Sequence, residues 1–490
     1  MARKPHDLVH PPKARPGERI AVLSPSFAAA GAFPAVHEQA MQRLSEVTGL
    51  TPVEFPTTRQ VGASPQARAA DVNAAFADPA IRAVLAVIGG EDQITVIPHL
   101  DASLARRDPK PFLGTSDNTN LHHWLWVNGI ASFYGGSSQV HLGPGPGVDD
   151  VHAQSLRAAL LTGETIELTE PGESEDYGID WGDPRALTHF GEREPAEAWT
   201  WHGPARSVTG RTWGGCIAVI EWILTAGRFP FDPEVLHGGA LVIETSEELP
   251  PAREVGSILR SLGERGILAA VGAVLAARPP VSDFTRRPPA GERAGLRAGQ
   301  RDVIVDIVGR YNPEAVVCIG IPFGHTRPQW VIPHGGVITV DGAARRVIAE
   351  PTTPELAARR TAWMLIHCCY SHTRSTFTES ELGQKITKRS QEPSPALAGR
   401  AARPSPVPAS DRRPLVLPGC YQVPTGSRTP GTGLARELWS RSSGRVRVPA
   451  GDRARGAHLT RPGWVIARVA TAFAEGERAS RAGNRLPDGG

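Results

Sequence analysis

A serine at the junction of a predicted strand and a predicted helix is the best candidate for a nucleophile. Ser116 lies in the segment Phe112-Leu-Gly-Thr-Ser-Asp-Asn-Thr119, where an apolar run ends, a glycine follows and a helical pattern begins. A turn of this kind exposes the hydroxyl beside helix N-terminal amides, which can stabilise a developing oxyanion. The segment also fits a simpler interpretation, in which Ser116, Asp117 or Asn118 merely caps the helix.

Glu244 and His325 are the residues that could assist such a serine. Glu244 directly follows the apolar run 240–243, where partial desolvation suits an acid that orients and stabilises a histidine. His325 follows another apolar run, in a loop rich in glycine and proline, where catalytic bases often occur. A single loop histidine is more often structural or solvated, so neither residue is decisive alone. The nearby acids Glu247 and Glu248 have less apolar surroundings and are predicted to be solvated.

Two glycines, Gly89 and Gly90, end the apolar run 83–88. Glycine lets the backbone approach another group closely, and two adjacent amides could complete an oxyanion hole. Pairs of glycines are also common in ordinary turns, so the pair supports a catalytic site only in combination with other signals.

The elements that must position these groups alternate between strand and helix. Apolar runs predict strands at residues 19–23, 51–55, 83–88, 111–113, 240–243 and 315–319, and a hairpin at 337–348. Periodicity and end signals predict helices at residues 33–47, 65–78 and 252–265, and from residue 121 onward. Strands that are apolar throughout and separated by helices indicate an α/β fold with a parallel sheet covered on both faces.

Composition and charge divide the chain into a body and a tail. Its 490 residues include 52 Gly and 45 Pro, which suggests many loops or a disordered region. From residue 356 onward there are 22 Lys and Arg against 9 Asp and Glu, a net charge of +13, whereas the preceding residues carry −10. We therefore predict an acidic folded body and a basic, low-complexity tail, largely disordered over residues 375–490. Nothing in this body gives a reason to expect nucleic-acid binding.

Several other classes of protein are not favoured. No run approaches 18 apolar residues, so we expect no transmembrane helix, and residues 1–17 lack the apolar run of a signal peptide, so we expect a cytoplasmic protein. The five cysteines fit neither a disulfide framework nor a paired zinc site and are expected to be reduced. The adjacent His122 and His123 would point to different sides of a helix, so we expect no metal there and no cofactor.

Taken together and in this order, the segments resemble the family of LD-carboxypeptidases and microcin C immunity peptidases (peptidase family S66). The resemblance covers roughly residues 16–350. The matching segments are Pro16-Gly17-Glu18-Arg19-Ile20-Ala21-Val22, Gly89-Gly90, Ile97-Pro98-His99-Leu100-Asp101, Gly114-Thr-Ser-Asp-Asn-Thr119, Tyr134-Gly135-Gly136, Gly214-Gly215, Glu244-Thr245-Ser246-Glu247 and Phe323-Gly324-His325-Thr326.

The resemblance implies a role for each candidate residue. Ser116 would be the nucleophile, His325 the general base and acid, and Glu244 the residue that orients His325. The amides of Gly90 and Asp117 would form the oxyanion hole.

The resemblance also implies an architecture. A flavodoxin-like domain at residues 1–145 would carry the nucleophile, and a swivelling α/β domain at 205–355 would carry the acid and the histidine, with the active site between them. Residues 146–204 would connect the two domains, with loop character. The tail, 356–490, has no counterpart in the family pattern.

The implied reaction is amide hydrolysis through an acyl-enzyme at Ser116. The substrate would be either a muramoyl tetrapeptide or an aminoacyl group joined to a modified nucleotide, and the run Asp117-Asn118-Thr119-Asn120 is closer to the immunity branch. The family pattern is broken at Cys216, which follows Gly215 where a polar residue is expected, so substrate details stay open. We expect a homodimer that binds a small peptide or peptidyl-nucleotide, and no nucleic acid or membrane as partner.

Two other functions remain as alternatives. An α/β-hydrolase esterase has the same order of serine, acid and histidine, but its turn requires glycine two residues after the nucleophile, where this chain has Asn118. A catalytically inactive ligand-binding relative is the other alternative, although all three triad positions are filled.

Overall fold

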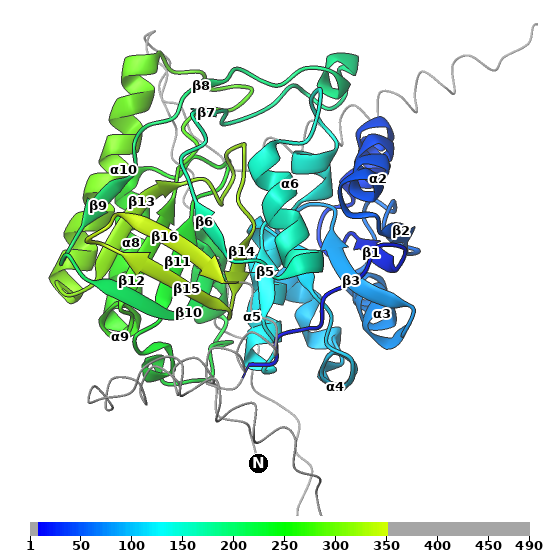
Figure 1. Ribbon diagram of the computed structural model, residues 1–490, viewed down its shortest axis with the longest axis horizontal. Coiled ribbons are helices and arrows are strands. Elements are labelled where there is room, and N and C mark those ends of the chain that lie inside the picture. The colour runs from blue at the N-terminus through cyan, green and yellow to red at the C-terminus, as the bar shows by residue number, and fades with distance from the viewer. Residues whose placement is uncertain (1–7, 351–490) are drawn as a thin grey trace, which may run out of the picture. The chain divides into compact units, whose positions relative to one another are not determined.

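The computed structural model describes residues 8–350, which belong to one compact unit (Figure 1). The predicted tail, with its disorder over 375–490, lies outside the described residues, as do Cys368, Cys369 and Cys420. Cys216 and Cys318 are buried free thiols. Within the described part, no helix is both long enough and apolar enough to cross a bilayer.

The first sheet has six strands in the order β14-β5-β4-β3-β1-β2. The strands are β1 (Arg19–Leu23), β2 (Thr51–Glu54), β3 (Ile81–Ala86), β4 (Phe112–Gly114), β5 (Ser132–Tyr134) and β14 (Ile332–His334). All neighbours are parallel except β14, which pairs antiparallel with β5. The four strands predicted in this part of the chain are confirmed to within a few residues.

Alternation along the strands gives this sheet two apolar faces. In β1, Ile20 and Val22 belong to one core cluster, and Ala21 and Leu23 belong to another on the opposite face. The covering helices are α1 (Ala29–Ala32), α2 (Pro34–Thr48), α3 (Pro65–Ala77), α4 (Ala102–Arg107) and α5 (Thr119–Val127). The Ser64 side chain caps α3 by accepting the Ala67 N–H at 3.2 Å, as the sequence predicts.

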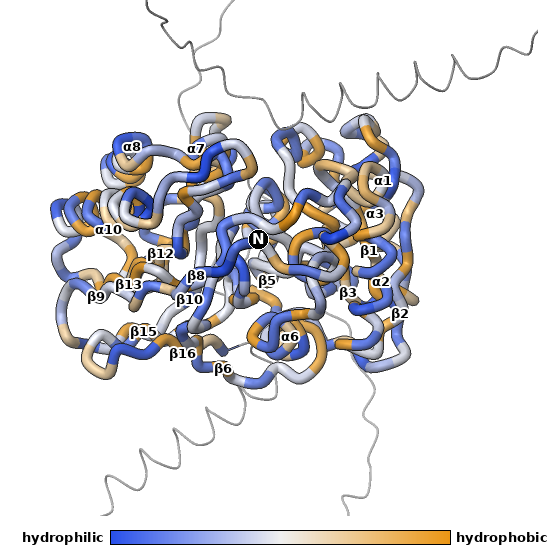
Figure 2. Tube along the Cα trace, turned by 90° about the horizontal axis from the view of Figure 1, so that it is seen from above, coloured by the Kyte–Doolittle hydropathy of each residue, from blue (hydrophilic) through white to orange (hydrophobic). Residues whose placement is uncertain are grey.

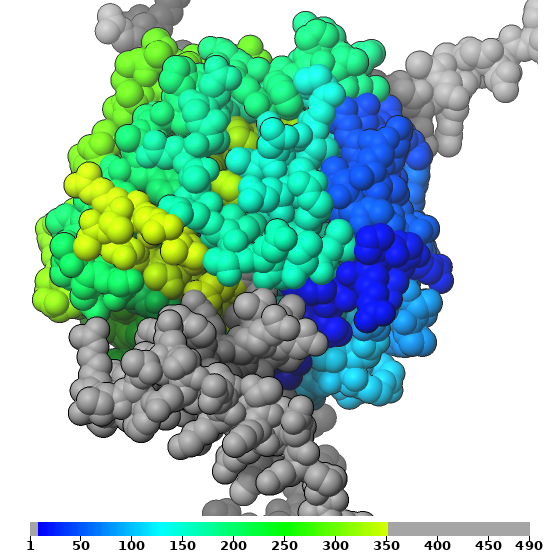
Figure 3. Space-filling model, viewed as in Figure 1, coloured from blue at the N-terminus to red at the C-terminus, as the bar shows by residue number. Residues whose placement is uncertain are grey.

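The connecting segment contains more regular structure than expected. It holds α6 (Asp150–Arg157), followed by β6 (Ile166–Leu168), β7 (Glu173–Ser174), β8 (Glu194–Pro195) and β9 (Thr200–His202). The buried face of α6 includes the polar His152 and Ser155 beside Ala153 and Leu156, so few apolar residues mark this face in the sequence. In the space-filling view this segment, coloured cyan to green, occupies the middle of the visible face, between the blue N-terminal residues and the yellow-green C-terminal strands (Figure 3).

The second sheet has eight strands in the order β6-β16-β15-β10-β11-β12-β13-β9. The strands not yet named are β10 (Ser207–Cys216), β11 (Ala240–Glu244), β12 (Ala273–Ala277), β13 (Val316–Ile321), β15 (Val337–Asp341) and β16 (Arg346–Glu350). Strands β10 to β13 are parallel, and the predicted hairpin is confirmed as β15–β16.

Helices pack beside the parallel part of the second sheet. They are α7 (Ile217–Thr225), α8 (Ala252–Glu264), α9 (Ile267–Ala270) and α10 (Ala290–Tyr311). In α8, Val255, Ile258, Leu259 and Leu262 are buried at helical spacing, and hydrophobic and hydrophilic stretches alternate along the helix (Figure 2).

The order of strands in space does not follow their order in the chain. Strand β14 belongs to the predicted C-terminal range but joins the first sheet, while β6 and β9 from the predicted connection form the two edges of the second. Strand β14 therefore ties the two sheets together, because its neighbours in the chain, β13 and β15, belong to the second sheet. The boundaries at 145, 204 and 355 stay a prediction.

Candidate active site

Ser116 occupies a strained position directly after β4. It opens a short 3₁₀ helix (Ser116–Asn118) that leads into α5, and its φ is 62°. A left-handed non-glycine residue costs on the order of 1–3 kcal/mol and is found preferentially at functional sites. The cap positions of these two helices, Thr115 and Asn118, make no side-chain capping bond. The structure therefore has no capping arrangement here, and Ser116 is the half-buried residue of a turn whose neighbours Asp117 and Asn118 are buried.

Gly89 leaves room for this serine. A Cβ atom on Gly89 would lie 2.8 Å from Ser116 Oγ and 3.2 Å from the Asp117 amide nitrogen. A Cβ on Gly90 would instead lie 2.2 Å from Ser26 Oγ. Gly89 therefore lies against the serine turn and Gly90 lies beside Ser26, and the oxyanion hole formed by the amides of Gly90 and Asp117 stays a prediction.

The Asp117 side chain has a structural role. Its buried carboxylate accepts hydrogen bonds from Ser26 Oγ at 2.6 Å, from the Gln93 amide at 2.8 Å and from the Asn120 side chain at 2.8 Å. Burial raises the pKa of Asp117, against the effect of the hydrogen bonds from Ser26 and Gln93. These bonds fix the turn, and only the backbone amide of Asp117 is left as a candidate for catalysis.

Glu244 and His325 are brought together as the sequence predicts. The buried Glu244, at the end of β11, contacts His325 Nδ1 through Oε2 at 2.5 Å. Gly324 makes this approach feasible, because a Cβ there would lie 2.7 Å from the Glu244 Cβ. The carboxylate therefore defines which ring nitrogen is left for chemistry, namely Nε2.

Tyr134 connects the serine turn to Glu244. Its hydroxyl accepts the Ser116 N–H at 2.9 Å and donates to Glu244 Oε1 at 2.6 Å. Burial and the adjacent Glu244 raise the pKa of Tyr134 well above its ordinary value, so the phenol stays protonated and keeps donating. Sequence reasoning gave Tyr134 no role, although it lies in one of the segments that match the family.

Two glycines at the end of β10 leave room for the serine turn to pack against this strand. Gly214 and Gly215 both have positive φ, at 143° and 134°, and a Cβ on Gly215 would lie 2.5 Å from Thr119 Oγ1. Thr119 Oγ1 in turn donates to the Ser116 carbonyl at 2.6 Å and accepts the Cys216 N–H at 3.0 Å. The Cys216 amide at the end of β10 thereby holds the serine turn through the Thr119 side chain.

Gln329 anchors the loop that carries His325. Its side-chain oxygen accepts the Gly136 N–H at 2.9 Å, and its side-chain nitrogen donates to the Gly324 carbonyl at 2.8 Å. This buried amide joins the end of the first sheet to the histidine loop, and no sequence signal pointed to it.

Glu247 was predicted to be solvated, and this is only partly correct. Its side chain is 60% exposed, yet its carboxylate lies 3.1 Å from His325 Nε2. Burial lowers the pKa of His325, but Glu244 and Glu247 outweigh it and raise that pKa well above its ordinary value. Partial desolvation of the Glu247 carboxylate raises its pKa, but the adjacent His325 ring outweighs this and lowers that pKa to about 2. Within residues 8–350, Nε2 has no hydrogen-bond partner, neither Ser116 nor Glu247, so the contact with Glu247 is an ion-pair distance only.

Other candidate sites lie outside this constellation. His122 contacts Ser132 Oγ at 2.8 Å and the Gly114 carbonyl at 2.9 Å, whereas His123 contacts the Arg228 carbonyl at 2.9 Å. The two rings therefore have separate partners within the fold.

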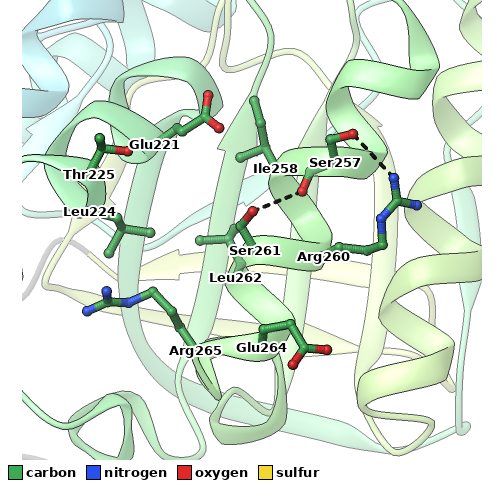
Figure 4. A pocket seen from close by; sticks show the side chains of 10 residues that line it. All are labelled: Glu221, Leu224, Thr225, Ser257, Ile258, Arg260, Ser261, Leu262, Glu264 and Arg265. Atoms are coloured by element: carbon green, nitrogen blue, oxygen red, sulfur yellow. Dashed lines mark hydrogen bonds between the residues drawn. The ribbon is translucent and has the colours of Figure 1, made fainter.

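A cavity of about 550 Å³ opens between α7 and α8 (Figure 4). None of Ser116, Glu244 and His325 lines it.

Comparison with known families identifies the class of protein. The profile of the LD-carboxypeptidase N-terminal domain matches residues 20–135, and that of the LD-carboxypeptidase C-terminal domain matches residues 209–340. The chain belongs to the LD-carboxypeptidase family, peptidase family S66. This assignment sets aside the α/β-hydrolase alternative and confirms the family and mixed α/β fold expected from the sequence.

Named relatives agree with this family. A Vibrio cholerae protein provisionally named a carboxypeptidase is 26% identical over 332 residues, 66% of this chain and 92% of that protein. The microcin C7 self-immunity protein of Escherichia coli is 23% identical over 282 residues, 56% of this chain and 75% of that protein.

Solved structures of similar proteins share the fold. The apo form of the microcin C7 self-immunity protein superposes with a TM-score of 0.60 at 19% identity, covering 70% of this chain and 98% of that one. A similar protein from Streptococcus pneumoniae, solved with AMP, gives 0.60 at 23% identity and covers 69% of this chain and all of that one (100%).

Proposed function

We propose that the protein is a serine peptidase that hydrolyses an amide bond through Ser116, His325 and Glu244. The observation that carries the proposal is the contact between Glu244 and His325 Nδ1 at 2.5 Å, together with the Tyr134 hydroxyl, which donates to Glu244 and accepts the Ser116 N–H. Membership of a peptidase family supports it.

In the proposed reaction, Nε2 of neutral His325 takes the Ser116 proton as Oγ attacks the amide carbon. Glu244 holds the ring and stabilises the imidazolium that forms, and the ring then gives the proton to the leaving nitrogen. Water, activated by the same histidine, releases the acyl group. The amides of Gly90 and Asp117 are proposed as oxyanion donors, each contributing about 2.7–4 kcal/mol to the transition state.

Two substrate classes follow from the relatives. A murein peptide carboxypeptidase of Bacillus subtilis, provisionally so named, is 26% identical, and the microcin immunity protein has been solved with aspartyl sulfamoyl adenosine. We therefore propose that the substrate is either a muramoyl tetrapeptide or an aminoacyl-nucleotide amide.

The first test offers both substrates to the full chain and to its Ser116→Ala variant, with products identified by mass spectrometry. Loss of a triad nucleophile commonly lowers turnover by on the order of 10⁶. Thermal midpoints control for folding, and Ser246→Ala, which changes a serine two residues from Glu244, is the matched control. A Ser116→Ala variant that keeps a tenth of the wild-type rate would remove Ser116 from the mechanism. A wild-type protein inert on both substrates would favour a ligand-binding relative.

A further inference from the structure

The His325 ring lies between two carboxylates, and only one of them belongs to the proposed triad. Glu244 contacts Nδ1 at 2.5 Å, and Glu247 lies 3.1 Å from Nε2. Nε2 is the nitrogen that must take the Ser116 proton in the proposed mechanism, on which this inference rests. In the part of the chain that the structure describes, Nε2 makes no hydrogen bond to Ser116 or to Glu247, and the Glu247 carboxylate is the charged group at ion-pair distance from it.

The position of Glu247 is determined by the turn that carries it. The Leu249 N–H donates to the Ser246 carbonyl at 3.2 Å, and the largely buried Leu249 has a φ of 53°. Gln300 of α10 accepts from Thr245 Oγ1 at 3.4 Å and donates to the Pro250 carbonyl at 2.8 Å. The turn is thus held at both ends, and it directs an exposed carboxylate at the histidine.

The other charged groups near His325 do not offset this pair. His141, from the π-helical turn Ser138–Leu142, is kept neutral because burial, with the nearby His152, Arg327 and His325, lowers its pKa well below the ordinary value. Arg327, on the same loop as His325, is bound to Asp149 through Nε at 2.6 Å. The two glutamates therefore dominate the electrostatics of the ring.

We propose that Glu247 is a positioning residue that holds Nε2 of His325 in the free protein and must give way before Ser116 can be activated. When Glu247 withdraws, the proton on Nε2 passes to water. The neutral ring then accepts the proton from Ser116 Oγ as the bond from Oγ to the substrate carbon forms. Glu247 thereby sets the pH at which the base becomes available.

The first test measures the His325 titration without turnover. Histidine NMR on the full chain in the Ser116→Ala background would follow the ring with Glu247, with Glu247→Gln and with Glu248→Gln. We expect Glu247→Gln to lower the pKa of His325 by about one unit, because a neutral amide no longer stabilises the imidazolium. Glu248 neighbours Glu247 on the same turn and makes no described contact with His325, so Glu248→Gln should leave the pKa nearly unchanged. An unchanged pKa in Glu247→Gln would overturn the proposal.

The second test measures kcat/KM from pH 5 to 9 on whichever substrate the wild-type protein cleaves. The acidic limb of the kcat/KM profile of Glu247→Gln should move to lower pH. On that limb the kcat/KM of this variant should exceed that of wild type by about tenfold for each unit by which the pKa of His325 falls, and at pH 9 the two values should agree within about twofold. Glu247→Ala should shift the limb in the same direction, and thermal midpoints control for folding. A uniform loss of rate with an unmoved limb would overturn the proposal. If the wild-type protein cleaves neither substrate, the proposed function fails while the NMR titration still decides the role of Glu247.

Discussion

At the scale of single residues, both oxygens of the Glu244 carboxylate are in use. Oε1 accepts from Tyr134 and Oε2 contacts His325, so the carboxylate is oriented from one side and orients the ring on the other. A carboxylate held in this way stabilises the imidazolium better than a freely rotating one, because it needs no reorganisation during the reaction.

Glu244→Gln should keep the shape of the site and lose the charge. We expect turnover to fall by on the order of 10⁴, with little change in thermal midpoint, as is typical when the acid of a triad becomes an amide. Steady-state kinetics above neutral pH, with Glu247→Gln measured in parallel, would check this. If Glu247→Gln lost more turnover than Glu244→Gln there, Glu244 would not be the acid of the triad.

At the scale of elements, the site is assembled from the carboxyl ends of strands in two sheets. Ser116 follows β4 and Tyr134 ends β5 in the first sheet, whereas Glu244 ends β11 and His325 follows β13 in the second. The buried hydrogen bond from Tyr134 to Glu244 is therefore a direct link between the sheets.

Tyr134→Phe should loosen this link while preserving the packing of the ring. Loss of the hydroxyl leaves a buried Glu244 oxygen without its donor, which costs about 1–3 kcal/mol in unfolding free energy. We expect kcat to fall more than KM rises, because the acid and the serine turn lose their common partner. Tyr311→Phe is the matched control, since Tyr311 also donates to a glutamate, Glu264, but in an exposed position. Equal effects in denaturant melts and kinetics of the two variants would count against the role of Tyr134.

At the scale of the whole molecule, buried neutral histidines couple stability to pH. Burial lowers the pKa of His122, His123 and His152 to about 4 each, against an ordinary value of 6.5. The unfolded chain therefore binds more protons than the folded one between about pH 4 and 6.5, and stability falls as pH falls through that window.

Acidification from pH 7 to 5 should accordingly lower the thermal midpoint. For each histidine, one unit of difference between its folded and unfolded pKa corresponds to about 1.4 kcal/mol of unfolding free energy. Replacing the buried His152 by Gln should flatten this dependence, whereas His237→Gln should not, because the His237 side chain is 73% exposed. Differential scanning fluorimetry across the window would check this. Identical slopes in both variants would show that these histidines do not set acid stability.

The tail can be tested by deletion at the same scale. Removing residues 375–490 should leave thermal midpoint and cleavage rate unchanged, because every candidate site residue lies within residues 8–350. The segment is rich in Pro, Gly, Ser and Arg, and such a composition does not bury enough apolar surface to offset about 1–2 kcal/mol of backbone entropy per residue. A midpoint lowered by more than a few degrees would show that the tail belongs to the fold.

The sequence by itself determined β1 to β4, β11, β13 and the hairpin, the turn at Ser116 and the places of Glu244 and His325, whereas β12, which is apolar throughout, was not predicted. These features are local: a buried strand needs several adjacent apolar residues, and a strand-to-helix turn needs its glycine nearby. Helix α6 was missed because it is only eight residues long and half of its buried face, His152 and Ser155, is polar.

Only the tertiary structure decided which distant groups meet. Tyr134 reaches Glu244 across 110 residues of chain, and Gln329 reaches Gly136 across 193. Glu247 has the surroundings of a solvated side chain in the sequence, yet the turn held by Gln300 directs it at Nε2 of His325. Such contacts have no local signature, because a hydrogen bond depends on where two chain segments are placed in space and not on the residues adjacent to either partner.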